Sequence, residues 1–317
     1  MSPLLAALAA QIPASEAELD AIVRTACYRY KVYTIPKRSG RGLRTIAQPA
    51  PEVKWIQNVV VAKILNKWPL HSAATAYRKG TSTADHASRH TMSRFLLKLD
   101  FADFFPSIKA SDVALHVVAH TTLSDQDQRR LVNILTWRNK KTGGYCLSIG
   151  APSSPFVSNS ILCEFDTRVD EFCRAAGVNY SRYADDLAFS TLSDGALEDV
   201  SKFVQQTLQS ISYPRLSLNA AKSVNVSKKH RRSLVGLVLT PEGNISIGRE
   251  QKRLLRAQIH KFTLGRFDPM NEPSLRGMLA YVLSVEPAFV SRLAERYSQE
   301  TIARLGVSAA AIKRRAG

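Results

Sequence analysis

The hydrophobic positions of this 317-residue chain recur with two different periods. Short runs with the period of two, or with continuous apolar residues, predict strands. The clearest is Phe95–Asp100, FLLKLD, which predicts a buried strand ending in a carboxylate. Tyr28–Gln48 predicts a hairpin around a turn at Ser39-Gly40-Arg41-Gly42, and Val178–Thr191 predicts a second hairpin with Ala184-Asp185 near its tip. Short strands are expected to return over Leu216–Thr240.

The remaining apolar positions follow the helical period of 3.6. Ser111 is a good N-cap residue, so we expect it to cap the helix that runs to His120. We find no internal repeat and no low-complexity linker, and Gly143-Gly144 marks a turn. The predicted class is therefore α+β. Helices are expected over residues 1–27, 49–69, 111–120, 152–174 and 198–211, and over most of the chain from Ile247.

Charge narrows the range of partners. The chain holds 44 Lys and Arg against 26 Asp and Glu, a formal net charge of +18. Residues 222–317 alone hold 18 basic and 7 acidic residues (18 − 7 = +11), and residues 24–44 hold seven basic residues and no acidic one. Such a field attracts polyanions, so nucleic acid is the leading partner and an anionic membrane surface is the alternative.

Membrane insertion and secretion are not expected. No apolar run approaches the roughly 20 residues that span a bilayer. Leu4–Ala10 follows no basic residue and precedes acidic ones, so it predicts a helix and not a signal peptide. The four cysteines lie far apart and form no CxxC pair, which suggests neither a zinc site nor a disulfide framework. We therefore expect a cytoplasmic protein that acts away from the membrane.

Three carboxylates stand out as candidate chemistry. Asp185 and Asp186 adjoin at the predicted hairpin tip, and Asp100 ends the buried strand. If these strands are neighbours, the acids converge. Hard oxygen ligands of this kind suit Mg²⁺, and two such ions about 4 Å apart can hold the attacking and leaving oxygens of a phosphoryl transfer. An isolated Asp-Asp pair is more often a solvated turn, but the second acid and the basic excess favour chemistry.

Several ordered segments resemble the polymerase motifs of reverse transcriptases. These are LDFADFFPSI, GAPSSPFVSN and YADDLAFS, in the family's order. YRYKVYTIPKRSGRGLRTIAQP, RRSLVGLVLTPEGNISIGRE and RGMLAYVLSVEP extend a narrower resemblance to the retron reverse transcriptases over roughly residues 25–290. The resemblance implies a right-hand polymerase with fingers, a palm built on an antiparallel sheet, and a helical thumb. The implied boundaries are 1–95 for the N-terminal helix and fingers, 96–240 for the palm with part of the fingers, and 241–317 for the thumb.

The resemblance also implies roles for individual residues. Asp100, Asp185 and Asp186 would be the catalytic metal ligands, helped by the carbonyl of Phe101. Phe105 would be the steric gate that rejects a ribose 2′-OH, unless the Phe104-Phe105 pair simply packs in the core. The other implied nucleotide contacts are Arg44 (with Lys37 a weaker candidate), Asp103, whose side chain could instead cap a helix, Gly150, and Lys222 as a proton donor to pyrophosphate.

The chain departs from the family in three places. Ile149 stands where glutamine is common, His86 replaces the asparagine of an Asn-Ala-x-x-His patch ending at His90, and Leu234-Val235-Gly236 replaces Val-Thr-Gly. The resemblance places His86, His90, Val235 and Gly236 at nucleic acid, whereas as structure alone the two histidines would be exposed on a helix. In the predicted thumb, the residues expected to grip the duplex backbone are Lys252, Arg253 and Arg256, with Lys261, Arg266 and Tyr281 beyond.

The resemblance implies RNA-directed DNA synthesis on a cognate structured noncoding RNA, primed from a guanosine 2′-OH, with msDNA as product and antiphage defence as its setting. Residues 222–317 contain one aspartate, Asp268, so we expect no RNase H domain, and a host RNase H would remove the template. A separate effector protein is the expected partner. Two alternatives stay open: another small bacterial reverse transcriptase of the diversity-generating or group II intron kind, and a catalytically silent RNA-binding scaffold.

Overall fold

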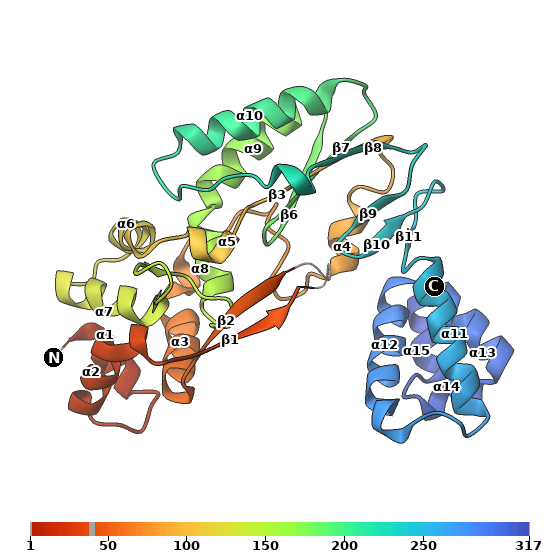
Figure 1. Ribbon diagram of the computed structural model, residues 1–317, viewed down its shortest axis with the longest axis horizontal. Helices are drawn as coiled ribbons and strands as arrows, with labels where there is room; N and C mark the ends of the chain where they lie inside the picture. The colour runs from red at the N-terminus through yellow and green to blue at the C-terminus, as the bar shows by residue number, and fades with distance from the viewer. Residues whose placement is uncertain (1, 38–41, 317) are drawn as a thin grey trace. The chain divides into compact units, whose positions relative to one another are not determined.

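The computed structural model describes residues 2–37 and 42–316, which form two compact units that interleave along the chain (Figure 1). The first unit takes in the chain up to Lys79, Lys98–Phe189 and Gly195–Val224. The second takes in Gly80–Leu97, Ser190–Asp194 and the chain from Asn225. In the described residues, no helix has both the length and the apolar character that crossing a bilayer requires.

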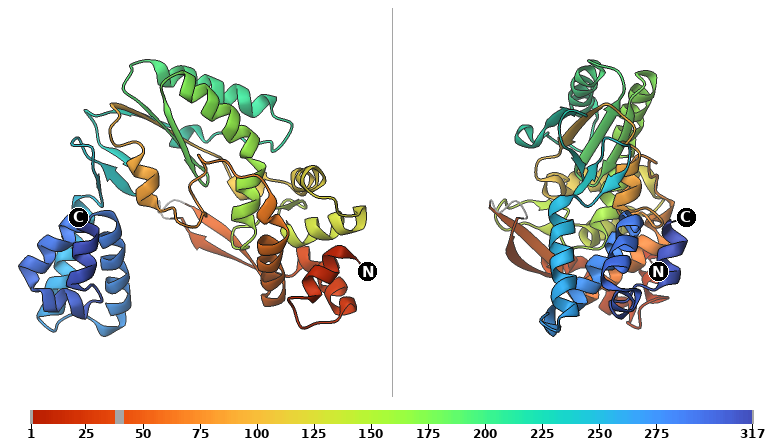
Figure 2. Two further views of the ribbon diagram at one scale, coloured as in Figure 1. Left: turned by 180° about the vertical axis from the view of Figure 1, so that it is seen from behind. Right: turned by 90° about the vertical axis from the view of Figure 1, so that its right-hand side faces the viewer.

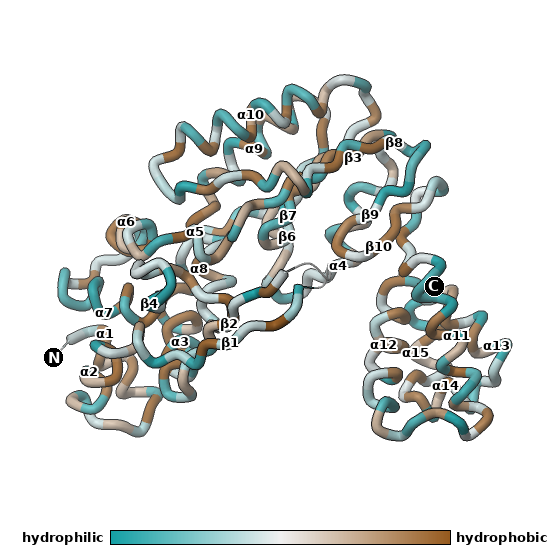
Figure 3. The backbone as a smooth tube through the Cα atoms, in the orientation of Figure 1, coloured by the Kyte–Doolittle hydropathy of each residue, from teal (hydrophilic) through white to brown (hydrophobic). Residues whose placement is uncertain are grey.

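The main sheet has the strand order β6-β7-β3-β8. Its central strand β3 is buried on both faces, because Leu96 and Leu97 are consecutive, point to opposite faces and are both buried. In Figure 3, α10 alternates between hydrophilic and hydrophobic colours along its length, as expected for a helix that buries one face. The predicted strand 95–100 and hairpin 178–191 are confirmed. The bounds are β3 (Phe95–Asp100), β6 (Asn179–Tyr183), β7 (Asp186–Thr191) and β8 (Val224–Ser227).

Helices α9 and α10 lie side by side next to this sheet (Figure 2). Their contact includes the stacked rings of Phe172 and Phe203, 4.0 Å apart. The predicted helix 152–174 is two helices, because the chain leaves helical geometry at Leu162. The helices of the first unit are α1 (Pro3–Ala9), α2 (Glu16–Thr25), α3 (Pro51–Lys63), α5 (Phe104–Ser107), α6 (Ala110–His120), α7 (Asp125–Leu135), α8 (Ser154–Ile161), α9 (Cys163–Ala175) and α10 (Ala196–Ser210), with 3₁₀ turns η1 (Ala26–Tyr28), η2 (Leu65–Lys67) and η3 (Ala220–Lys222).

The predicted N-terminal hairpin is confirmed as the antiparallel pair β1 (Tyr30–Pro36) and β2 (Leu43–Pro49). Its expected turn lies mostly on residues 38–41, outside the described residues. Partners across the pair share a face, so Arg44 lies on the face of its partner Ile35. A second short pair joins β4 (Trp137–Arg138) to β5 (Tyr145–Cys146).

The predicted cap at Ser111 is wrong. Helix α6 begins at Ala110, with Lys109 as its N-cap residue. The carboxylate of Asp112, in the first turn, accepts the backbone N–H of the N-cap residue Lys109 at 2.8 Å, so a side chain three residues after the cap satisfies this donor. Ser111 therefore lies inside the first turn.

The second unit combines a small sheet, the short helix α4 and a helical bundle. The sheet has the order β11-β10-β9, and α4 packs against β10 and β11. The mixture of sheets and helices in both units confirms the α+β class. The bounds are α4 (Thr83–Ser88), β9 (Arg232–Leu234), β10 (Leu237–Leu239), β11 (Ile245–Ser246), α11 (Arg249–Thr263), η4 (Pro269–Asn271), α12 (Glu272–Val285), α13 (Pro287–Tyr297), α14 (Gln299–Arg304) and α15 (Ala309–Ala316).

Candidate active site

The structure brings Asp100, Asp185 and Asp186 together. Asp100 ends β3, Asp185 lies in the turn between β6 and β7, and Asp186 is the first residue of β7. The backbone N–H of Phe101 donates to the carbonyl oxygen of Asp185 at 3.1 Å, which fixes the strand end to the turn. Ala184 has a φ of 57°, a left-handed conformation that lets the chain reverse within the turn.

The pKa values of Asp185 and Asp186 are both raised in this cluster. Desolvation by the surrounding protein is the largest cause that raises the pKa of Asp186 to about 7. The charges of Asp185 and Asp100 and a hydrogen bond with Asp100 raise it further. Asp186 is also exposed to solvent on the open side of the turn, which screens part of this effect. The pKa of Asp185 is raised by burial and by the charge of Asp100. Such a cluster is stabilised by any cation that enters it.

Lys222 supplies one cation. Its Nζ donates to both carboxylate oxygens of Asp100, at 2.8 and 2.9 Å, while half of its side chain stays exposed. Burial lowers the pKa of Lys222, but the hydrogen bond and charge of Asp100 outweigh burial and raise it. A protonated amine therefore lies at the edge of the carboxylate cluster.

The donor set suits a hard divalent metal, and reverse transcriptases use divalent metals. Asp185 and Asp186, whose pKa values are raised by burial and by neighbouring carboxylate charge, are with Asp100 oxygen donors of the type that Mg²⁺ prefers. In the described part of the chain, no three His, Cys, Asp or Glu side chains lie in an arrangement that could by itself hold a metal ion. Mg²⁺ commonly takes only one or two carboxylates from a protein, with water and substrate phosphate as its other ligands. The role of the Phe101 carbonyl stays a prediction.

The aromatic pair after Asp100 divides into two environments. Phe104 is buried and stacks on Phe101 with ring centroids 5.6 Å apart, whereas Phe105 stays partly exposed. Phe105 also packs against Phe104, with ring centroids 5.1 Å apart, so its role as the steric gate stays a prediction. Asp103 precedes helix α5 with a φ of 43°, and its side chain makes no capping hydrogen bond. The alternative capping role of Asp103 is therefore wrong.

Gly150 has a position that only glycine can fill. Its φ is 127°, and a Cβ there would lie 2.9 Å from the carbonyl oxygen of Ala47. The backbone carbonyl of the neighbouring Ile149 accepts the Ala47 N–H at 2.9 Å. Ile149, which differs from the family's glutamine, therefore joins the loop to β2 through its backbone. The exposed Arg44 lies on the same hairpin, and its charge offsets part of the rise in the pKa of Asp185 that burial and Asp100 cause. A cation therefore lies near the turn.

Tyr77 is a neighbour of the site that sequence reasoning missed. Its backbone has a φ of 63°, and its side chain is 54% exposed. Burial raises its pKa, followed by the charge of Asp185, so the phenol lies within electrostatic reach of the turn. The sequence carries no signal for it, because nothing in AATAYRKG predicts a left-handed tyrosine.

The expected surface position of His86 and His90 is wrong. Both imidazoles are buried in the second unit. Burial lowers the pKa of His86 to about 4 and that of His90 to about 3, so both are neutral. His90 Nδ1 lies 2.7 Å from the hydroxyl of Ser190. A part in nucleic-acid binding would have to be indirect, through the shape of the α4 surface.

The other predicted nucleic-acid residues fall into two groups. Val235 and Gly236 form the turn between β9 and β10, with φ of 45° and 86°. Arg253 and Arg256 are exposed on α11. The expected phosphate contact of Lys252 is wrong, because its amine is paired with Glu286 and its side chain is mostly buried. This ion pair links α11 to the start of α13.

Comparisons with known proteins agree with this geometry. Residues 35–239 match the family model described as reverse transcriptase (RNA-dependent DNA polymerase). The retron Ec83 reverse transcriptase of Escherichia coli is 39% identical over 277 residues, covering 86% of this chain and 88% of that protein. The retron Ec86 reverse transcriptase of the same species is 31% identical over 294 residues, covering 90% and 87%. The chain therefore belongs to the retron reverse transcriptases, with the right-hand polymerase fold and the RNA-directed DNA polymerase activity of that family.

Proposed function

We propose that this enzyme copies part of a cognate structured noncoding RNA into DNA, starting from a guanosine 2′-OH, and so makes branched msDNA. The observation that carries the proposal is the cluster of Asp100, Asp185 and Asp186 beside Lys222, in a chain of the retron family. Each carboxylate comes from a segment whose backbone is fixed to its neighbour, so the oxygens are already gathered before substrate arrives.

Two Mg²⁺ ions held by these carboxylates would activate the attacking hydroxyl and neutralise charge on the phosphates. The remaining work falls to side chains of the chain itself. Arg44 covers the triphosphate from the hairpin, and the protonated Lys222 amine donates a proton to the leaving pyrophosphate.

The nucleotide is selected next to Asp100. The partly exposed ring of Phe105 excludes a ribose 2′-OH, which favours dNTPs over rNTPs. The backbone around Asp103 lies beside the triphosphate. Gly150 acts by letting the loop approach β2, which sets where the hairpin residue Arg44 can reach.

The RNA and the product duplex are held mainly by the basic second unit. Exposed Arg253 and Arg256 contact phosphates, and the Val235-Gly236 turn contacts the cognate RNA. We further propose that the enzyme works in the cytoplasm with a separate effector protein in antiphage defence. A host RNase H would remove the copied template.

The test is to express the chain in bacteria with its flanking genomic DNA, purify it and extract the bound nucleic acid. One half is treated with RNase and the other with debranching enzyme before sequencing. A short DNA species joined to RNA, absent from the Asp185→Ala, Asp186→Ala double variant, is the expected result.

RNA without attached DNA, unchanged by the double substitution, would contradict the proposal and favour a silent RNA-binding scaffold. Synthesis on unrelated RNA templates, with no requirement for the flanking RNA, would favour a diversity-generating or intron-type enzyme instead. Binding to the RNA alone does not separate these cases, so the covalent RNA–DNA junction is the decisive readout.

A further inference from the structure

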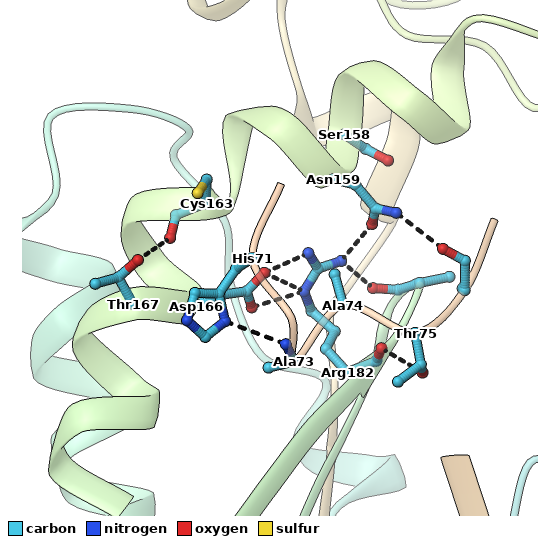
Figure 4. Close-up of polar contacts among 12 residues, drawn as sticks. His71, Ala73, Ala74, Thr75, Ser158, Asn159, Cys163, Asp166, Thr167 and Arg182 are labelled. Atoms are coloured by element: carbon cyan, nitrogen blue, oxygen red, sulfur yellow. Dashed lines mark hydrogen bonds and ion pairs between the residues drawn. The ribbon is translucent and has the colours of Figure 1, made fainter. Parts of the chain in front are cut away.

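A buried arginine directly precedes the catalytic turn. Arg182 lies on β6, and its side chain is fully buried, with 0% exposed. Isolated buried charges are costly, so an arginine inside an apolar sheet needs partners for its whole guanidinium. Figure 4 shows those partners gathered around it from α8, α9 and the turn.

The guanidinium is bonded on each side. Nε and Nη2 donate to the carboxylate of Asp166, at 2.9 and 2.6 Å, and Nη1 donates to the amide oxygen of Asn159 at 3.0 Å. Nη1 also donates to the carbonyl oxygen of Ala184 at 3.0 Å. The fork of the guanidinium therefore joins a helix carboxylate to the backbone of the turn, which a lysine amine could not do at once.

The bond to Ala184 matters because of where that residue lies. Ala184 has the left-handed conformation of the turn, and the next two residues are Asp185 and Asp186. A left-handed alanine costs free energy relative to an ordinary conformation, so it persists only where surrounding bonds hold it. The Arg182 guanidinium provides such a bond from inside the protein.

The same network also holds the segment that leads to Tyr77. The Arg182 backbone N–H donates to the carbonyl of Ala73 at 2.7 Å, and its carbonyl accepts from the Thr75 N–H at 2.8 Å. The Asn159 side-chain amide donates to the carbonyl of Ala76 at 2.9 Å. The residue after Ala76 is the left-handed Tyr77, which lies within electrostatic reach of Asp185. One buried network therefore sets both edges of the site.

We propose that Arg182, with Asn159 and Asp166, is a positioning group that fixes the Ala184-Asp185-Asp186 turn in its metal-binding geometry. The inference rests on the proposed role of Asp185 and Asp186. A misplacement of about 1 Å in such groups can cost about a hundredfold in rate, whereas a purely structural ion pair changes stability alone. The two readings therefore differ in kinetics.

The main test is Arg182→Lys, assayed by single-turnover incorporation of one dNTP on an RNA template with a DNA primer. The lysine keeps the charge beside Asp166 but loses the simultaneous bond to Ala184. The maximal rate per active enzyme is expected to fall about tenfold to a hundredfold, and the Mg²⁺ concentration at half-maximal rate to rise. Without substrate, the Mg²⁺ concentration that gives half of the maximal increase in melting temperature should rise as well. The apparent affinity for dNTP should change less than about threefold, because no nucleotide contact is removed.

Asn159→Ala is the second variant, in case Arg182→Lys fails to fold. It keeps the Arg182–Asp166 ion pair and removes one guanidinium acceptor and the bond to Ala76. We expect a rate loss of about threefold to tenfold with the same Mg²⁺ shift.

Arg130→Met is the matched control. Arg130 pairs with Asp127 and Asp20 at 2.9 and 2.7 Å in the same unit, with 11% of its side chain exposed, but at the N-terminal helices. Its loss should lower the melting temperature and leave the single-turnover rate and the Mg²⁺ midpoint unchanged.

Three outcomes decide the matter. Normal rates and Mg²⁺ midpoints in Arg182→Lys and Asn159→Ala, with Asp185→Ala inactive, would overturn the positioning role and leave the proposed function standing. Rate losses of equal size in the Arg130→Met control would also overturn it, as general destabilisation. Full activity in Asp185→Ala and Asp186→Ala would overturn the carboxylate assignment itself, which is a separate failure.

Discussion

The two units each bury an arginine, and they solve the same electrostatic problem differently. Arg182 in the first unit faces the carboxylate of Asp166, whereas Arg232 in the second, 1% exposed, donates to the carbonyl oxygens of Ser93, Thr91 and Thr240. Burial lowers the pKa of both guanidinium groups, but Asp166 outweighs burial at Arg182 and raises its pKa. Arg232 has no such compensation, and its pKa stays lowered.

The difference shows what each arginine is suited for. Replacing either partner of a buried arginine–carboxylate pair is costly, because the other partner's charge is then left unpaired in the interior. Carbonyl oxygens are weaker partners that bind three separate backbone positions and tolerate small shifts between them. The rigid centre lies beside the catalytic turn, and the more tolerant one ties the segment between α4 and β3 to the small sheet.

The largest expected effect is at the ion pair. Asp166→Asn leaves the Arg182 guanidinium buried without its counter-charge, and we expect it to lower the free energy of unfolding of the first unit by about 3–5 kcal/mol. The double variant Asp166→Leu, Arg182→Met should be more stable than the single one, since no charge is stranded. Urea unfolding measures this by tryptophan fluorescence, because Trp55, Trp68 and Trp137 all lie in the first unit.

Arg232→Met should have a smaller effect. It leaves three carbonyl oxygens with fewer donors but strands no charge, so we expect a loss of about 1–3 kcal/mol, confined to the second unit. Hydrogen exchange of the α4 and β9 amides measures it, and tryptophan fluorescence should stay unchanged. A loss larger than that of Asp166→Asn would contradict the contrast between the two centres.

Changes in pH should affect the two units with opposite signs. The folded pKa of Asp186 is raised to about 7, above the ordinary 3.8. Its penalty on the stability of the metal-free first unit is therefore fully present above pH 7 and is removed progressively as pH falls from about 7 toward 3.8. The folded pKa values of His86 and His90 are lowered from 6.5 to about 4 and about 3. Their contribution to stability is fully present above pH 6.5 and is lost as pH falls toward those folded values.

Lowering the pH from 7 to 5 should therefore reduce the hydrogen-exchange protection factors of the α4 amides and increase those of the β6–β7 turn of the metal-free enzyme. Polymerase activity should fall over the same range, because Asp186 must be ionised to bind a cation, and higher Mg²⁺ should move the midpoint to lower pH. Protection factors that change in the same direction in both units would contradict the assignment.

The smallest effect separates internal from surface cations in α11. Arg253→Gln should weaken duplex binding and reduce the slope of log affinity against log salt by about 1, as expected for one phosphate contact. Lys252→Met should leave that slope unchanged, because its amine is paired with Glu286. Fluorescence anisotropy of a labelled RNA–DNA duplex at several salt concentrations measures both.

The carboxylate cluster could be predicted from the sequence because its chemistry is written in local patterns. An apolar strand that ends in Asp100, and a second that reverses at Ala184-Asp185, place both acids at sheet edges. The nucleotide contacts depended more on the family resemblance than on any pattern in the residues themselves.

The errors at the two histidines and at Lys252 share a physical cause, which is packing between segments far apart in the sequence. Helix α4 is only six residues long, too short for its period to show which side is buried, so His86 and His90 were expected at the surface. Lys252 belongs to a basic run in the sequence. Only the fold shows that its amine pairs with Glu286, 34 residues later. The buried position of Arg182 was equally hidden, because Asn179–Tyr183, NYSRY, is polar in sequence and only the fold shows that Arg182 is buried.

The interior position of His86 and His90 has a consequence for synthesis on the ribosome. These side chains emerge with α4, but β10 and β11, the strands that α4 packs against, are translated much later, near residues 237–246. Until then this six-residue segment has no strand to pack against and is too short to hold a helix by itself. The second unit therefore cannot close until the chain has been synthesised past residue 246.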